Sequence, residues 1–174
     1  EIFWNRSKIV YVLSDFQVNK ALGCRIPIQP GKGYSLTLEN YANSFSVPCI
    51  LKDARLAVTP WESGYRISGF MEFSGYNKTI DQSSINMMLQ GHKKYFGDID
   101  SGKKDQETTY GWRPMTYDGL PLIDRSFALK NLMIAAGHNM VGMGMGPMTG
   151  KIVADIVGKE TSKINLEPYK FRKL

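Results

Sequence analysis

Hydrophobic and polar residues alternate in several short segments of the first half of the chain, which is the pattern of strands with one buried face. We expect strands at 8–13, 34–38, 50–58 and 65–73. Residues 27–33 contain two prolines and two glycines, which predicts a turn-rich connection before the second strand. Residues 59–64, Thr-Pro-Trp-Glu-Ser-Gly, predict a hairpin loop between the last two strands.

The strand at 65–73 has two distinct faces in this interpretation. Alternation places Tyr65, Ile67, Met71 and Phe73 on one face, and Arg66, Ser68, Phe70 and Glu72 on the other. The period then becomes helical, with one stripe made of Ile85, Met88, Leu89, His92 and Phe96. Ser83 or Ser84 is the expected N-cap and Gly97 the expected end of this helix. The polar segment 98–107 predicts a loop and a domain boundary.

The last third of the chain has a different character. Residues 132–136 are all apolar, which is typical of a strand buried on both faces. A glycine-rich stretch follows from Gly137 to Gly150, and we expect it to be a loop. Thr149 then predicts the N-cap of a helix that ends at Gly158. The whole pattern indicates an α+β fold, with a mixed, largely antiparallel sheet and helices on one face, followed by a strand-loop-helix element.

Two glycine-containing segments are candidate ligand loops. Glycines allow close backbone approach, and a helix N-terminus attracts anions. The stretch after Gly137 lacks the GxGxxG spacing, since Thr149 stands where a third glycine is needed, and we expect it to be too long for a dinucleotide turn. A cofactor contact and a flexible connection lined by core methionines (Met140, Met143, Met145, Met148) both stay open. Residues 31–33, Gly-Lys-Gly, lack Walker spacing and predict a strand-entry turn.

Arg113 and His138 are the candidate polar site residues. Arg113 precedes Pro114, so its backbone is expected to be extended, and its guanidinium could bind a carboxylate in bidentate fashion. From the residues alone, a surface arginine or a structural ion pair with Asp118 or Asp124 is the favoured alternative. His138 could be a general base, but a histidine after a buried strand is more often a hydrogen-bonded structural residue, so we assign no catalytic residue.

Composition excludes several classes of function. The 174 residues carry a net charge of +6, but the charges are scattered and no nucleic-acid-binding motif is present. Two cysteines and two histidines, none in a paired motif, do not predict a metal site. No apolar run approaches the roughly 20 residues that a membrane-spanning helix needs.

Five segments of the chain resemble one family of flavoproteins. They are RIPIQPGKGYSLTL (25–38), DARLAVTP (53–60), RISGFMEFSG (66–75), GWRPMTYDGLPLID (111–124) and NLMIAAGHNMVGMGMGPMTGKIVADIVGK (131–159). In this order they resemble the D-amino acid dehydrogenase branch of the D-amino acid oxidase-like family, which includes glycine and sarcosine oxidases. The resemblance extends from Leu22 to Lys159.

The resemblance implies a domain organisation and a site. Residues 1–109 would be mainly the substrate-binding domain, and 110–174 the returning C-terminal part of a discontinuous FAD-binding domain. Arg113 would hold the carboxylate of an amino acid or amine substrate. The flavin would be contacted by Gly137, His138, Asn139, Met140, Val141, Gly142, Met143, Gly144 and Met145. Arg113 and this loop should therefore lie close together.

The implied function is oxidation of D-amino acids to 2-oxo acids by hydride transfer to FAD. Gly111 occupies the region where some members attach flavin to a cysteine, so the FAD would be noncovalent. The family's GxGxxG unit is not matched, so we expect a C-terminal part of a longer protein that does not retain FAD and is inactive by itself. A glycine- or sarcosine-type oxidase and a non-catalytic binding domain are the alternatives. We expect a cytoplasmic protein, and leave open peripheral association with the inner face of the cell membrane through an electron acceptor.

Overall fold

The two halves of the fold are separate compact units, each described by itself. The computed structural model describes residues 8–12, 26–39, 46–61, 64–99, 106–127 and 129–171. One unit consists of Gly31–Trp112, and the other combines Glu1–Pro30 with Arg113–Leu174. The chain passes from one unit to the other after Pro30 and returns after Trp112, and the boundary expected near residue 109 lies close to this return. The first 30 residues, however, belong to the same unit as the C-terminal part.

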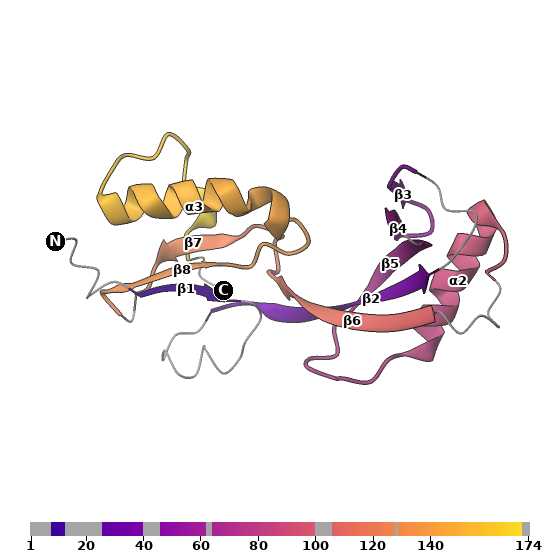
Figure 1. The fold of residues 1–174 in the computed structure, drawn as a ribbon. Helices are drawn as coiled ribbons and strands as arrows, with labels where there is room; N and C mark the ends of the chain where they lie inside the picture. The colour runs from indigo at the N-terminus through magenta and orange to yellow at the C-terminus, as the bar shows by residue number, and fades with distance from the viewer. Residues whose placement is uncertain are drawn as a thin grey trace. The chain divides into compact units, whose positions relative to one another are not determined.

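The unit Gly31–Trp112 is built on a five-stranded sheet with the order β3-β4-β5-β2-β6 (Figure 1). The strands are β2 (Gln29–Glu39), β3 (Cys49–Leu51), β4 (Leu56–Trp61), β5 (Gly64–Glu72) and β6 (Gln106–Met115). β3 with β4, β4 with β5, and β2 with β5 are antiparallel pairs. Helix α2 (Gln82–Phe96) packs against β4 and β5. The buried core consists of Tyr34, Leu36, Leu38, Leu56, Val58, Tyr65, Ile67, Ile85 and Met88.

Several of the predicted strand boundaries in this unit were wrong, including the expected hairpin loop 59–64, because β4 continues to Trp61 and β5 begins at Gly64. β2 begins at Gln29, so residues 29–33 form a strand where a turn was expected. Lys32 can be fully buried in this strand because its ammonium donates hydrogen bonds to the carbonyl oxygens of Asn77 and Thr79. The predicted strand 50–58 is two strands, β3 and β4, joined by a turn at residues 52–55 in which Arg55 has a φ of 53°.

A β-bulge reverses the predicted faces at the end of β5. Lys32 is paired with Glu72 and Tyr34 with Gly69, so β5 has one residue more than β2 between these pairs. Phe70 adopts a positive φ of 57° within this interval. As a result Phe70 packs against the core, whereas Phe73, expected on the same face as Tyr65 and Ile67, is 55% exposed.

Helix α2 ends where expected but is capped by a different residue. Asp81 is the N-cap, and its carboxylate accepts hydrogen bonds from the backbone N–H groups of Ser83 and Ser84, both at 3.1 Å. A carboxylate at this position also suits the positive end of the helix dipole. Gly97 terminates the helix with a φ of 84°, which confirms the prediction.

The second unit is a three-stranded sheet, β1-β8-β7, with one long helix on a face (Figure 1). β1 (Lys8–Val12) is parallel to β8 (Leu132–Ala136), and β7 (Leu122–Arg125) is antiparallel to it. All five residues of β8 are buried, which confirms the strand buried on both faces. Met133 and Ala135 pack with Ile152 and Val153 of helix α3 (Gly142–Gly158), and a short 3-10 helix, η1 (Glu167–Tyr169), follows. On the other side of β8 lie Leu132, Ile134 and Ala136, which pack with Ile26 and Leu122.

The expected start of α3 was wrong. The helix begins at Gly142, so only residues 137–141 form the loop, and Thr149 lies inside the helix and is buried. Isolated helix propensity disfavours the glycines of this segment by about 1 kcal/mol each, but packing of the helix on the sheet overrides propensity. The expected end at Gly158 is confirmed, with Lys159 in the left-handed conformation as the C-cap.

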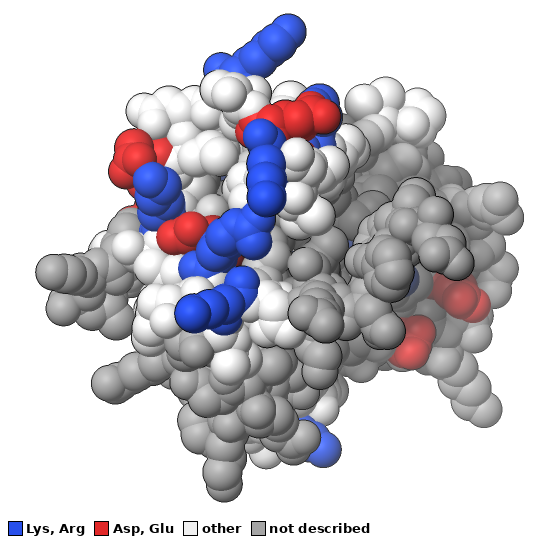
Figure 2. All heavy atoms as spheres, turned by 90° about the vertical axis from the view of Figure 1, so that its left-hand side faces the viewer, with Lys and Arg blue, Asp and Glu red and all other residues white. Residues whose placement is uncertain are grey.

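Positive and negative side chains are interspersed, and several form ion pairs with residues close by in the sequence. On the face shown in Figure 2, Lys and Arg side chains lie among Asp and Glu side chains. Lys151 pairs with Asp155 on α3, and Lys170 pairs with Glu167 on η1. Within the described ranges, no helix is long and apolar enough to cross a membrane. The same ranges contain no group of three or more His, Cys, Asp or Glu side chains placed to hold a metal ion.

Candidate active site

The loop between β8 and α3 is tight and closely packed at its first residue. Gly137 has a φ of 74°, a conformation that L side chains rarely adopt. A Cβ atom at this position would lie 2.5 Å from the Cγ2 atom of Thr116. The backbone of the loop can therefore approach Thr116 only because residue 137 is glycine.

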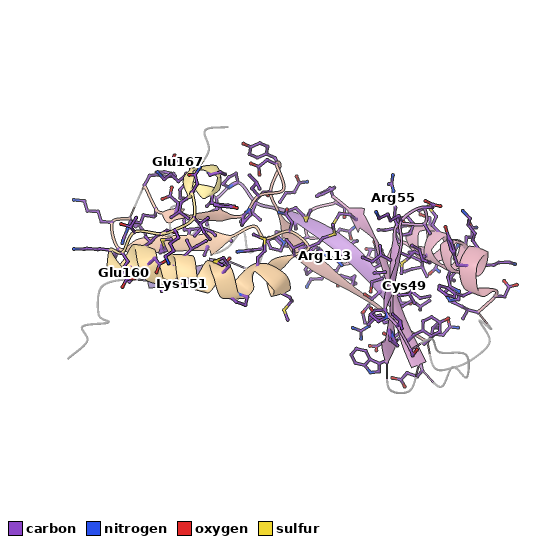
Figure 3. The ribbon with its side chains drawn as sticks, turned by 90° about the horizontal axis from the view of Figure 1, so that it is seen from above. Cys49, Arg55, Arg113, Lys151, Glu160 and Glu167 are labelled. Atoms are coloured by element: carbon purple, nitrogen blue, oxygen red, sulfur yellow. The ribbon has the colours of Figure 1, made fainter. Side chains whose placement is uncertain are left out.

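The same loop is hydrogen-bonded to the end of β6. The backbone N–H of Asn139 donates to the carbonyl oxygen of Pro114 at 3.1 Å, and the Oδ1 atom of Asn139 accepts the backbone N–H of Thr116 at 2.9 Å. Arg113, the neighbour of Pro114 in β6, therefore lies beside the loop, as expected from the sequence (Figure 3).

Arg113 is half-buried and has no counter-charge. Within the described part of the chain, its guanidinium forms no ion pair or hydrogen bond. The two carboxylates considered as partners are used elsewhere, because Asp118 accepts the backbone N–H of Leu120 and Asp124 accepts that of Phe171, both at 3.1 Å. Burial lowers the pKa of Arg113 from its ordinary value, but an arginine stays protonated. A partly desolvated cation without a partner is suited to bind an anionic group.

His138 is held inside the unit. Its side chain is only 3% exposed, and its Nε2 atom lies 2.8 Å from the Oγ1 atom of Thr149 on α3. Burial lowers the pKa of His138, so the ring is neutral at neutral pH. This contact joins the end of β8 to the second turn of α3 and explains why Thr149 is a buried helix residue and not an N-cap.

The start of α3 presents an apolar surface, which we call the α3 entry surface. It consists of Met140, Val141, Met143, Gly144 and Met148, of which Met143 is 97% and Met140 70% exposed. A Cβ atom added at Gly144 would meet nothing within 4 Å. Val141, the N-cap, makes no capping hydrogen bond through its side chain, and the first N–H groups of any helix lack intrahelical acceptors. Such a surface fits a flat, partly apolar ring with acceptor atoms at its edge.

The structure divides the predicted flavin-contacting residues into two sets. Gly137, His138 and Asn139 are packed or hydrogen-bonded within the unit, and Gly142 and Met145 are partly buried. The others, Met140, Val141, Met143 and Gly144, are exposed on the α3 entry surface. Sequence reasoning missed Thr116 altogether and did not foresee the hydrogen bonds of Asn139. The available signal was an asparagine two residues after a glycine, since both residue types favour left-handed turns.

Comparison with known proteins assigns the family. The family model DAO, described as FAD dependent oxidoreductase, matches residues 12–156. The chain belongs to this family. It is 31% identical over 153 residues to a D-amino acid dehydrogenase of Paramagnetospirillum magneticum, covering 85% of the chain and 35% of that protein. It is 35% identical over 145 residues to a D-amino acid dehydrogenase of Neisseria gonorrhoeae, covering 80% of the chain and 34% of that protein.

Solved structures of family members share the fold. An iminodiacetate oxidase from Chelativorans sp. BNC1 matches with a TM-score of 0.71 at 24% identity, over 88% of the chain and 42% of that protein. A glycine oxidase from Geobacillus kaustophilus matches with a TM-score of 0.72 at 19% identity, over 90% of the chain and 42% of that protein. The DAO-family chain thus has the mixed α+β architecture of these flavoenzymes. It spans about a third of the length of the curated relatives it matches.

Proposed function

We propose that the protein to which this chain belongs oxidises D-amino acids to 2-oxo acids and uses FAD as its cofactor. The observation that carries the proposal is Arg113, a half-buried guanidinium without a counter-charge, next to the loop that leads into the α3 entry surface. Support from outside the chain comes from the family and from relatives named D-amino acid dehydrogenase.

Arg113 binds the substrate carboxylate in this proposal. Its planar guanidinium can donate two parallel hydrogen bonds to the two carboxylate oxygens, which fixes both the position and the orientation of an amino acid. Partial burial strengthens this contact, which we estimate to contribute ~2–4 kcal/mol. No ion pair within the described residues has to be broken first, so the free energy of binding is not reduced by a competing carboxylate.

In this proposal the residues of the α3 entry surface would hold the ring system of a noncovalently bound FAD. Gly144 permits close approach of the helix backbone, and Met140 and Met143 offer apolar, polarisable contacts to an aromatic ring. The N–H groups of the first turn and the helix dipole would stabilise negative charge on a bound flavin. A bound flavin would supply the two-electron acceptor for the hydride of the substrate Cα, and water would then hydrolyse the released imino acid to the 2-oxo acid and ammonia. The protein orients the substrate and supplies no general base in this scheme, since His138 is buried against Thr149.

The two units have different roles in the proposed enzyme. The unit with Arg113 and α3 belongs to the FAD-binding domain, and Gly31–Trp112 forms the main part of the substrate-binding domain. We propose a cytoplasmic enzyme that can associate peripherally with the inner face of the cell membrane through its electron acceptor.

The test is an Arg113→Leu substitution in the full-length protein. We expect kcat/KM for D-alanine to fall by roughly 10²–10³-fold, within the 2–5 kcal/mol that loss of a buried charged contact costs, while the bound flavin stays at the wild-type level. Lys130→Leu, which removes an exposed cation from the same unit, is the matched control.

Activity is measured with an artificial electron acceptor and flavin content by visible absorbance. L-alanine, glycine and sarcosine complete the substrate panel, so that a glycine- or sarcosine-type oxidase would be recognised. If Arg113→Leu and Lys130→Leu have the same kcat/KM, Arg113 does not hold the substrate and the proposed site is wrong.

A further inference from the structure

The side-chain amide of Asn139 uses both of its N–H groups in hydrogen bonds within the unit. Its Nδ2 group donates to the carbonyl oxygens of Gly137 and Gly119, both at 2.9 Å, and lies 3.2 Å from the Oγ1 atom of Thr116. An amide nitrogen has two hydrogens, so these acceptors use both of them. The amide of Asn139 therefore has no N–H left for a flavin, although the sequence suggested this residue as a cofactor contact.

Two further hydrogen bonds of Asn139 join it to the end of β6, the strand that contains Arg113. The backbone N–H of Asn139 binds the carbonyl of Pro114 at 3.1 Å, and its Oδ1 atom accepts the backbone N–H of Thr116 at 2.9 Å. These two contacts fix the residues one and three positions after Arg113. Together with the bonds to Gly137 and Gly119, they join the end of β6, the turn at Gly119 and the loop before α3 through a single side chain.

We propose that Asn139 is a positioning residue that fixes Arg113 relative to the α3 entry surface, so that a substrate carboxylate held by Arg113 is placed over the flavin. This inference rests on the proposed function. Asn139 acts through Arg113 and touches neither substrate nor flavin.

Few residues other than asparagine satisfy this position. The backbone of Asn139 has a φ of 54°, in the left-handed region that asparagine adopts more readily than most residues. One acceptor and two donors are needed at once, and among short side chains only asparagine offers them. Aspartate would place an oxygen against the carbonyl oxygens of Gly137 and Gly119 and would lose both donors.

The test is a double-mutant cycle in the full-length, flavin-loaded protein. Asn139→Gly keeps the backbone conformation and removes every side-chain bond. We expect it to lower kcat/KM for D-alanine about 10- to 100-fold, mainly through KM, with wild-type flavin content. In the Arg113→Leu background the same substitution should lower kcat/KM by no more than about 2-fold, because the group it positions is gone. Asn131→Gly, an exposed asparagine in the same unit, is the matched control.

Asn139→Asp serves as the second variant in case Asn139→Gly does not fold. It keeps the size of the side chain and reverses the polarity toward two carbonyls, so we expect the same rise in KM. The inference alone is overturned if the effects of Arg113→Leu and Asn139→Gly multiply, if Asn139→Gly behaves like Asn131→Gly, or if both Asn139 variants lose their flavin. An unchanged kcat/KM in Arg113→Leu, or no oxidation of any amino acid by the wild type, would overturn the proposed function and this inference with it.

Discussion

In each of the two units a single polar side chain holds a segment without regular structure, but Lys32 is fully buried and charged whereas Asn139 is partly exposed and neutral. In Gly31–Trp112, the ammonium of Lys32 donates to the carbonyls of Asn77 and Thr79 at 3.1 and 2.7 Å. It also lies 3.2 Å from the carboxylate of Glu72. In the other unit, the neutral amide of Asn139 donates to the carbonyl oxygens of Gly119 and Gly137. Both side chains bind backbone carbonyls of a segment without regular structure, so both substitute for a sheet or helix ladder.

The difference lies in what each network does to nearby charge. A buried ammonium needs a counter-charge, and Lys32 has one in Glu72, which also accepts a hydrogen bond from Tyr34. Burial lowers the pKa of Lys32, but hydrogen bonds to Tyr34 and Glu72 outweigh this and raise it above the ordinary value. An amide needs no counter-ion, so the network of Asn139 leaves the neighbouring charge of Arg113 unneutralised. A charged network such as that of Lys32 neutralises the buried cation, whereas the neutral amide network of Asn139 adds no charge beside Arg113, as the proposed substrate contact requires.

The largest expected effect is on the stability of Gly31–Trp112. Lys32→Met removes the ammonium that binds the carbonyls of Asn77 and Thr79, and it leaves the carboxylate of Glu72 without its counter-charge, because a thioether cannot replace these contacts. We expect the Tm to fall by on the order of 5–10 °C. Lys78→Met changes an exposed lysine in the segment that Lys32 holds and is the control. Equal Tm values for the two variants, measured by thermal unfolding, would contradict a structural role for the Lys32 network.

A second comparison, between Gly137 and Gly75, separates the cost of backbone strain from the cost of packing. Gly137 and Gly75 have similar positive φ values, 74° and 65°, but only Gly137 is crowded, by Thr116. Alanine at Gly75 should therefore cost only the conformational strain, ~1–2 kcal/mol. Alanine at Gly137 should cost that strain plus the displacement of Thr116, roughly 2–4 kcal/mol in total. Chemical denaturation of both variants measures the difference, and equal losses would mean that Thr116 moves aside without cost.

Local patterns predicted the fold class and the simplest elements. The apolar run at β8, the stripe and terminal glycine of α2, and the extended backbone at Arg113 all follow from residues close together in the sequence. Each depends on a single periodicity or a single steric rule. The resemblance to known motifs placed Arg113 beside the loop, which the Asn139–Pro114 hydrogen bond confirms.

The predictions that were wrong all depend on contacts between distant parts of the chain. Residues 29–33 form a strand because Lys32 finds acceptors more than 40 positions away. The glycines from Gly142 onward are helical because the later residues of α3 pack on β8 and Thr149 contacts His138. The hydrogen bonds of Asn139 to Thr116 span 23 positions. No local propensity contains this information, so sequence reasoning identified Asn139 by its place in a motif but could not predict its partners.

The smallest effect concerns the two helix starts and appears only in acid. Helix α2 begins at a carboxylate, Asp81, whereas α3 begins at Val141 without a side-chain cap. Hydrogen bonds from Ser83, and then from Ser84, lower the pKa of Asp81 to about 2. A carboxyl group whose pKa is lower in the folded than in the unfolded state stabilises the fold above its unfolded pKa, near 4. This contribution is lost as the pH falls from about 4 toward 2, when the carboxylate is protonated.

Asp81→Asn isolates this contribution, because asparagine is also a good N-cap but does not titrate. At pH 7 we expect a small difference in the free energy of unfolding between the variant and the wild type. Below pH 4 the wild type should lose stability more steeply, so the two curves of urea midpoint against pH should converge toward pH 2. Glu107→Gln, which removes an exposed carboxylate from β6, should leave the curve parallel to that of the wild type. If the Asp81→Asn curve is also parallel, the cap of α2 does not contribute to acid sensitivity, and the two units differ only in the networks of Lys32 and Asn139.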